Sequence, residues 1–389
     1  MKKDAPGGRS IPIKRSLLKT FLLCLPMMLL TFMMLTQGSI PTEGGRLFAL
    51  AVTFFFFNVL FFLMVRTEKT DRFRSILFVT LAVCFVISFV SNLIEVRGSM
   101  AISRADMIEG ETPFCHLVIP MTIIPAVLTK TIIFPGKILG DHAIAGMFVL
   151  WIGISLALGR GLCSWFCFFG GLEDGFSRIL KRPLIKNINK KWTYLPYAVL
   201  LVVVLMAALT LSPTYCEWLC PFKTVTEFVE ITSVKVLMQT IIFVSLFIGL
   251  VVVLPILTKR RTQCGLFCPL GAVQSVTNKT NPFEVRIDQG KCVKCNKCVS
   301  VCPTFSIDEE SLGRERVKTS CTKCGKCVDA CPQKALFYHV KGASLTSGLD
   351  RYRLLFLYPA FVVLATMAGG FVQDAIVKTI KLISTGSMI

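Results

Sequence analysis

The sequence predicts an α-helical polytopic membrane protein of about seven transmembrane helices, with a small α+β module inserted before the last helix. Three observations lead to this prediction. The 389 residues are 53% hydrophobic and 17% charged, with a mean hydropathy of +0.67, which is far more apolar than a soluble domain. Seven separate windows are apolar enough to cross a bilayer. A polar segment with two regular runs of cysteine lies between the last two windows.

Each of the seven windows has the length of a membrane span, because a helix needs about 17–25 apolar residues to cross a hydrocarbon core about 30 Å thick. The windows are Leu17–Thr36, Leu47–Val65, Ile76–Ile94, His142–Leu158, Leu195–Leu211, Val236–Leu257 and Leu354–Phe371. We interpret the first as an uncleaved anchor. Its apolar run is too long for a signal peptide, and no small-residue cleavage site follows it.

The basic residues predict the topology. The net charge is +20, but the lysines and arginines gather in short loops beside the spans, which indicates membrane orientation rather than nucleic-acid binding. Lys259, Arg260 and Arg261 follow the sixth window, whereas Gln37–Gly45 has no basic residue. We therefore expect the N-terminus and the inserted module inside and the C-terminus outside. Two prolines and a lysine interrupt Leu117–Phe134, which we expect to be re-entrant or interfacial on the outer side.

These assignments divide the chain into three parts. Residues 1–277 are expected to form a transmembrane bundle of six spans with three Cys-x3-Cys pairs. Residues 278–345 are expected to form the module, and residues 346–389 the final transmembrane helix and a C-terminal tail.

Eight of the 17 cysteines form two runs with the spacing Cys-x2-Cys-x2-Cys-x3-Cys-Pro. This is the run of bacterial dicluster ferredoxins, in which three thiolates hold one [4Fe–4S] cluster and the fourth reaches the neighbouring cluster. One cluster is therefore expected on Cys292, Cys295, Cys298 and Cys331, and the other on Cys321, Cys324, Cys327 and Cys302. A disulfide framework is disfavoured on a reducing cytoplasmic face, and zinc rarely uses such a repeated run.

Six further cysteines form three Cys-x3-Cys pairs, each just after a predicted span. They are Cys163 and Cys167, Cys216 and Cys220, and Cys264 and Cys268. Residues four apart share a helical face, so each pair can present two thiolates in one direction. The topology brings the first and third pairs to the inner side, where their four thiolates suit a third iron–sulfur cluster. The alternative is redox-active or buried thiols.

The order of spans, Cys-x3-Cys motifs and doubled ferredoxin run resembles the membrane polyferredoxins of the NapH/NosR/CcoG type. The resemblance covers roughly residues 142–340. It implies quinol- or copper-linked electron transfer in the bacterial inner membrane, with cytoplasmic clusters and a membrane or periplasmic partner such as a reductase subunit. The sequence departs from the family pattern in having three such pairs rather than two, and Phe168 where Pro is expected after Cys167. It also lacks a covalent flavin-attachment sequence.

A second metal site is predicted on the outer face. Cys115 and His116 lie in the long outer loop, and the topology places Cys216 and Cys220 on the same side. Together they suit an iron–sulfur cluster, zinc or copper, at about one hydrocarbon thickness, roughly 30 Å, from the inner site. The alternatives are a buried Cys115 and a local pair or disulfide of Cys216 and Cys220. His116 and His142 also leave open a haem ligand, a proton carrier or an interfacial histidine.

The remaining candidates are two isolated cysteines, one histidine and three polar residues in or next to the expected spans. Cys24 and Cys84 are expected to be buried without function, and His339 to serve packing. Asn58, Asn92 and Glu95 are expected to face the bundle interior and leave a quinone pocket open.

The predicted function is relay of electrons through the clusters, between a cytoplasmic or quinone donor and a membrane or periplasmic acceptor. No catalytic residue is identified, because the clusters carry the redox chemistry and the chain sets their surroundings. Two alternatives are a copper or iron reductase with an outer thiolate site, and a redox sensor or assembly scaffold for a respiratory complex.

Overall fold

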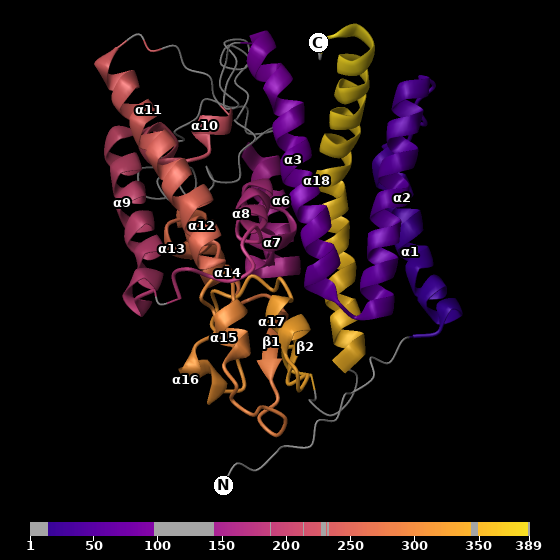
Figure 1. Ribbon diagram of the computed structural model, residues 1–389, viewed down its shortest axis with the longest axis vertical. Coiled ribbons are helices and arrows are strands. Elements are labelled where there is room, and N and C mark those ends of the chain that lie inside the picture. The colour runs from indigo at the N-terminus through magenta and orange to yellow at the C-terminus, as the bar shows by residue number, and fades with distance from the viewer. Residues whose placement is uncertain are drawn as a thin grey trace.

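The computed structural model describes residues 15–387 with gaps at 97–143, 187, 213, 227–230, 232 and 344–348, and Figure 1 shows its elements. Cys115, His116, His142 and the segment Leu117–Phe134 lie outside the described residues, so the predictions for them stay predictions.

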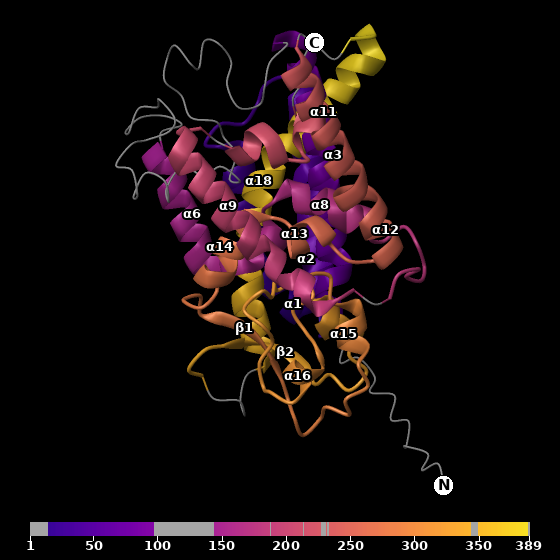
Figure 2. The same cartoon turned by 90° about the vertical axis from the view of Figure 1, so that its left-hand side faces the viewer.

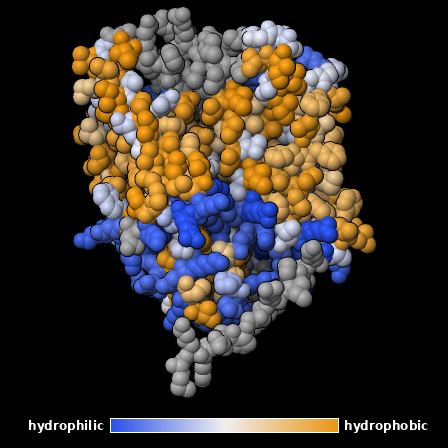
Figure 3. Space-filling view, in the orientation of Figure 1, coloured by the Kyte–Doolittle hydropathy of each residue, from blue (hydrophilic) through white to orange (hydrophobic). Residues whose placement is uncertain are grey.

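The described chain is mostly helical, and six of its helices are long and apolar enough to cross a membrane. They span Leu17–Thr36, Gly44–Thr67, Phe148–Trp165, Lys190–Thr210, Val234–Thr258 and Asp350–Thr385. The expected window Ile76–Ile94 lies in a continuous helix, α3 (Thr70–Val96), which is not among these six. The count of seven spans therefore stays a prediction. An apolar surface covers the upper part of the molecule in Figure 3, above a hydrophilic lower end.

The first three helices and the last one form one half of the bundle, on the right of Figure 1. They are α1 (Leu17–Thr36), α2 (Gly44–Thr67), α3 and α18 (Leu349–Thr385). Aromatic rings fill their interface, with the centroids of Phe61 and Phe361 4.8 Å apart. Asn58 is buried as expected and donates to the hydroxyl of Thr31 at 3.0 Å.

The other half is built of shorter, interrupted helices. They are α6 (Ile144–Leu158), η2 (Gly159–Gly161), α7 (Leu162–Trp165), α8 (Phe168–Phe176), η3 (Lys190–Tyr194), α9 (Leu195–Thr210), η4 (Tyr215–Leu219), α10 (Lys223–Thr226), α11 (Val234–Leu246), η5 (Phe247–Val253), α12 (Leu254–Thr258), α13 (Thr262–Leu266) and α14 (Pro269–Thr277).

One local fold occurs three times in this half, at the Cys-x3-Cys pairs. The helix stops before the second cysteine, whose backbone is extended at Cys167 (φ −70°, ψ 103°), Cys220 (φ −80°, ψ 107°) and Cys268 (φ −68°, ψ 118°). The N–H of Cys167 donates to the carbonyl of Leu162 at 3.0 Å, and that of Cys268 donates to Gln263 at 2.9 Å. A new helix then begins. The three pairs thus share one backbone conformation and differ in the residues that they contact.

The module contains an antiparallel pair of strands and three short helices. They are β1 (Phe283–Ile287), α15 (Lys297–Val301), α16 (Glu309–Leu312), α17 (Lys326–Ala330) and β2 (Leu336–Val340). Figures 1 and 2 place the module at the end of the bundle opposite the C-terminus, below α13 and α14. Tyr338 on β2 stacks on Phe356 of α18, with ring centroids 4.8 Å apart. This contact fixes the module against the last long helix.

Candidate functional site

The first group of module cysteines combines residues from both runs. Burial raises the pKa of the Cys327 thiol well above its ordinary value, and the neighbouring thiols of Cys321, Cys324 and Cys302 raise it further. All four are buried, at 5–9% exposure. The fourth cysteine of the first run therefore lies with the first three of the second run. In this arrangement the main-chain N–H of Ser306 points to the sulfur of Cys302 at 3.2 Å.

The second group combines the first three cysteines of the first run with the fourth cysteine of the second run. Cys292, Cys295, Cys298 and Cys331 line one small cavity. Burial raises the pKa of the Cys298 thiol to about 11, with smaller contributions from Cys331 and Cys292. The N–H of Ala335, four residues after Cys331, lies 3.3 Å from the Cys331 sulfur. Hydrogen bonds of this kind tune the potential of a cluster.

The first and third Cys-x3-Cys pairs face one another although about a hundred residues separate them. Cys163, Cys167, Cys264 and Cys268 are all less than 10% exposed. Burial raises the pKa of Cys264 well above its ordinary value, and Cys167 and Cys163 are among the further causes. Burial also raises the pKa of Cys268 to about 12, and the charge of Cys163 adds to this. The structure therefore brings together the four thiols expected at the inner site.

Two buried arginines tie these pairs together reciprocally. Arg160, three residues before Cys163, donates from Nη2 to the carbonyl oxygen of Cys264 at 3.0 Å. Arg261, three residues before Cys264, donates from Nη1 to the carbonyl oxygen of Cys163 at 2.9 Å. The guanidinium groups place two cations beside the four sulfurs, where they lower the cost of burying thiolates.

Two glycines let the backbone come close to the carbonyl oxygens of Cys163 and Cys264. They occupy equivalent positions, seven residues after the first cysteine of each pair. A Cβ atom on Gly170 would lie 2.7 Å from the carbonyl oxygen of Cys163, and one on Gly271 would lie 3.1 Å from that of Cys264. The repeated pattern Arg-x2-Cys-x3-Cys-x2-Gly is visible in the sequence and could have identified both arginines. Phe168 does not alter the site, since Cys167 has the same backbone conformation as Cys268 without a following proline.

A buried carboxylate completes the inner site. Glu173 on α8 accepts hydrogen bonds from the main-chain N–H groups of Gln263 at 2.5 Å and Cys264 at 3.1 Å. Burial raises the pKa of Glu173 to about 7. The carboxylate therefore caps the first turn of α13 and fixes the backbone that carries Cys264. No motif in the sequence singled out this residue.

The second pair lies closer to the inner site than the topology predicted. The side-chain amide of Gln263 donates to the hydroxyl of the buried Tyr215 at 3.0 Å. Burial raises the pKa of Tyr215, and Cys268, Cys220 and Cys216 raise it further. One tyrosine thus lies near thiols of both pairs. The expected separation of about one hydrocarbon thickness between these pairs is wrong, because the neighbour of Cys216 is hydrogen-bonded to the neighbour of Cys264.

Aromatic rings fill the space beside these thiols. Phe169, two residues after Cys167, stacks on Phe222, two residues after Cys220, with ring centroids 4.0 Å apart. Phe168 stacks on Phe85 of α3 at 3.8 Å. All four rings are buried.

The inner site is also bonded to the module. Arg261 donates from Nη2 to the hydroxyl of Thr322 at 2.9 Å and to that of Ser164 at 2.6 Å. The indole N–H of Trp165 donates to the carbonyl of Lys323 at 3.2 Å. Thr322 and Lys323 lie between Cys321 and Cys324, so the loop after Cys163 directly contacts the loop that carries the first module group.

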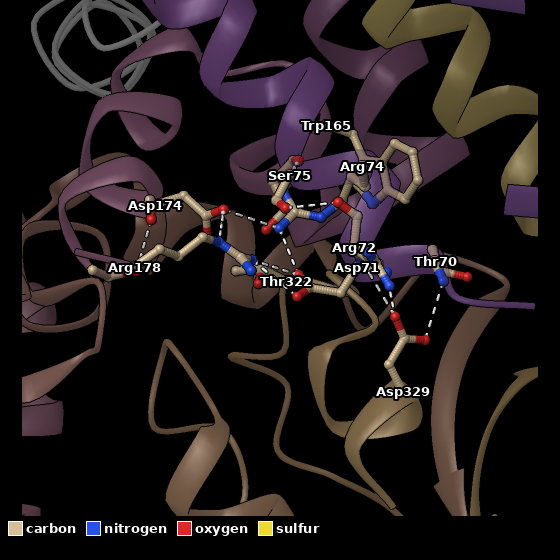
Figure 4. A network of polar contacts seen from close by, with 12 residues as sticks. Thr70, Asp71, Arg72, Arg74, Ser75, Trp165, Asp174, Arg178, Thr322 and Asp329 are labelled. Carbon is tan, nitrogen blue, oxygen red and sulfur yellow. Dashed lines mark hydrogen bonds and ion pairs between the residues drawn. The ribbon is translucent and has the colours of Figure 1, made fainter. Parts of the chain in front are cut away.

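Figure 4 shows the polar network around this junction. Arg74 on α3 is fully buried, donates to the carbonyl of Ser164 at 3.0 Å, and pairs with Asp71 at 2.8 Å and Asp174 at 3.3 Å. Asp329 of α17 accepts from the main-chain N–H of Asp71 at 2.8 Å. Helix α3 therefore joins the module to the inner site.

Four cysteines, the number in each of these three groups, are the ligand set of a [4Fe–4S] cluster. Among the residues that the structure describes, no three His, Cys, Asp or Glu side chains form a group that could hold one metal ion. In a [4Fe–4S] cluster each thiolate binds a different iron, so the four sulfurs are further apart than those around one zinc ion. Groups of four cysteines, with main-chain N–H donors directed at Cys302 and Cys331 in the module, suit such clusters.

Comparison with known protein families agrees with this chemistry. Residues 284–332 match a 4Fe-4S dicluster domain. A 4Fe-4S binding domain matches three times, at residues 141–187, 192–237 and 240–285. Each of these three matches contains one Cys-x3-Cys pair.

Several known proteins are similar in sequence. YccM of Escherichia coli, described as an electron transport protein, is 28% identical over 211 residues, which cover 52% of this chain and 56% of YccM. The methylamine utilization ferredoxin-type protein MauN of Methylobacillus flagellatus is 28% identical over 172 residues, or 44% of this chain and 58% of MauN. The ferredoxin-type protein NapH of E. coli is 25% identical over 193 residues, or 48% and 61%. The chain thus spans less than two thirds of each relative, and no solved structure matches it.

Proposed function

Because the chain belongs to the NapH-type family of membrane polyferredoxins, we propose that it relays electrons between a donor at the module and an acceptor in the membrane or beyond it. An iron–sulfur electron-transfer role is common to the ferredoxin-type relatives. The ligands and the quinone cavity proposed below rest on the geometry of this chain.

Three clusters have proposed ligands among the described residues. The module ligands are Cys292, Cys295, Cys298 and Cys331 for one cluster, and Cys321, Cys324, Cys327 and Cys302 for the other. The inner-site ligands are Cys163, Cys167, Cys264 and Cys268. Bound clusters would supply one-electron carriers. The chain supplies burial, cations and N–H donors around them.

The observation that carries the proposal is the position of Arg261. Its guanidinium contacts the carbonyl of Cys163 at the inner site and the hydroxyl of Thr322 beside Cys321 in the module. Two cysteine groups that sequence alone would leave in separate domains thus share one buried residue. This continuity favours electron relay over a scaffold or sensor, which would need no such contact.

The second Cys-x3-Cys pair lies next to the inner site and is the next candidate member of the relay. Cys216 and Cys220 lie beside Tyr215, which is bonded to Gln263 next to Cys264. We propose that Cys216 and Cys220 form an outer metal or iron–sulfur site with Cys115 and His116. Such a site would take electrons from the inner cluster without crossing the whole bilayer in one step.

A cavity at the junction of module and bundle is our proposed site for a quinone. Its volume is about 680 Å³, within the usual range for small-molecule sites. Its lining includes Tyr194 and Tyr197 at the start of α9, and tyrosine is enriched at membrane interfaces. Gly265 and Ser320 also line it, and they adjoin Cys264 and Cys321 in sequence. A headgroup bound there would lie beside both sites.

The proposed location is a bacterial inner membrane, with the module (residues 278–345) in the cytoplasm. The support is the basic run Lys259, Arg260 and Arg261 between α12 and α13, where the N–H of Arg261 donates to the carbonyl of Pro303 in the module at 2.8 Å. The partners would be redox proteins such as subunits of a respiratory or periplasmic reductase.

Anaerobic purification of the full chain, with iron and sulfide counting and electron paramagnetic resonance, tests the proposal. Three clusters correspond to about twelve iron atoms per chain, and a fourth at the outer site would add about four. A count of about eight iron atoms per chain would contradict the inner cluster and support only the two module clusters. A chain that assembles no cluster would overturn electron relay altogether.

A further inference from the structure

The two module cysteine groups differ in their access to solvent. The group that contains Cys302 is buried throughout and contacts the inner site through Thr322. In the other group Cys295 is exposed, and Cys292 and Cys331 are half-buried. The first group therefore faces the membrane bundle, and the second is the group that a soluble protein can approach.

Lysines surround this accessible group. Lys294 and Lys297 line the same cavity as Cys292 and Cys295, and Lys334 follows Pro332 and Gln333 of its lining. All three lysines are exposed. In the described part of the chain, none of them has a carboxylate partner. We call Lys294, Lys297 and Lys334 the lysine collar.

Nearby acidic residues do not neutralise the collar. Asp288 pairs with Lys291 at 2.9 Å, and Glu310 on α16 pairs with Arg314. Among the described residues of these segments, Glu309 is the acid that has no basic partner. The three exposed lysines therefore present unpaired positive charges at this surface, which attract negatively charged proteins and raise their association rate.

The middle of the collar is apolar. Val293 is 62% exposed and lies between Cys292 and Lys294. Pro332, next to Cys331, is also exposed. Electron-transfer complexes have small interfaces, so a few apolar contacts inside a charged rim suit a partner that binds and leaves quickly.

We propose that the lysine collar is the docking surface for a small acidic one-electron carrier protein of the ferredoxin class. The inference rests on the proposed function, because it assigns a partner to the module's accessible cluster. In each encounter the reduced carrier would give up one electron to a cluster held by Cys292, Cys295, Cys298 and Cys331. No proton or covalent bond is exchanged.

The test is a binding measurement on the full chain, purified with its clusters in detergent, with an acidic plant-type [2Fe–2S] ferredoxin as the probe. One variant combines Lys294→Glu, Lys297→Glu and Lys334→Glu. The matched control combines Lys186→Glu, Lys190→Glu and Lys191→Glu, which makes the same change in net charge at exposed positions near the start of α9. We expect Kd to rise about tenfold or more in the collar variant and to change little in the control.

Each outcome decides the inference. If the affinity for ferredoxin falls equally in both variants, net charge alone explains the effect and the specific docking surface is overturned. Failure of the wild-type chain to bind ferredoxin, or equal binding of the basic carrier cytochrome c, would also overturn it. Wild-type binding should weaken when salt shortens the Debye length to about 3 Å, a measurement that needs no variant. If iron and sulfide counts are normal but ferredoxin does not bind, the docking surface fails and the proposed relay stands.

Discussion

Arg261 donates a hydrogen bond to the carbonyl oxygen of Cys163 at 2.9 Å across 98 positions of sequence. Arg160 makes the equivalent bond to Cys264 at 3.0 Å. Each Cys-x3-Cys unit thus provides the arginine that supports the other unit, so neither half of the inner site is complete alone.

Arg261→Gln is expected to lower the reduction potential of the inner cluster, because a positive charge that favours the reduced, more negative state is removed. Loss of its buried bonds should also destabilise the chain by roughly 3–5 kcal/mol. Redox titration followed by electron paramagnetic resonance measures the potential. Arg316→Gln is the control, because it removes the same charge from an exposed position of the module. Equal potentials in wild type and Arg261→Gln would contradict the prediction.

Cys264→Ser is expected to remove the inner cluster and leave both module clusters. The iron content should fall by about four atoms per chain, and one set of resonance signals should disappear. Cys84→Ser replaces a half-buried cysteine on α3 that belongs to none of the three groups and should leave the iron content unchanged. An undiminished iron count in Cys264→Ser would remove the inner cluster from the relay.

Cys302→Ser is expected to perturb the signal of the cluster on Cys321, Cys324 and Cys327, because the thiols of Cys302 and Cys327 lie close together. Cys331→Ser should instead perturb the cluster on Cys292, Cys295 and Cys298. Each variant serves as the control for the other. The cluster signals of both are measured by electron paramagnetic resonance on anaerobic samples. The crossed assignment is wrong if each substitution affects the cluster of its own run.

A reporter fused after Gly342 is expected to be active only as a cytoplasmic probe, since the module adjoins the basic run that follows the sixth expected span. A reporter fused after Thr385, at the end of α18, should be active only as a periplasmic probe, because Figure 1 places that end of the bundle opposite the module. Reporter activity outside at Gly342 would reverse the proposed topology.

Local features of the sequence were enough to predict the helical membrane class, the family and the doubled cysteine run. The window Leu17–Thr36 coincides with α1, because hydropathy and the cap at Ser16 act over a few residues. The cysteine spacing likewise pointed to iron–sulfur chemistry, because one short loop wraps one corner of a cluster. Both kinds of signal lie within a single segment of chain.

The tertiary structure decided which segments meet. The predicted topology placed the first and third Cys-x3-Cys pairs on the same side, whereas their connection through Arg160 and Arg261 depends on long-range packing. Hydropathy placed Cys216 and Cys220 on the far face, but the chain after α9 turns back and brings Tyr215 to Gln263. Glu173 became recognisable only from its burial and its hydrogen bonds from Gln263 and Cys264. A short motif specifies its own turn of backbone, whereas a contact across a hundred residues depends on the packing of every helix between them.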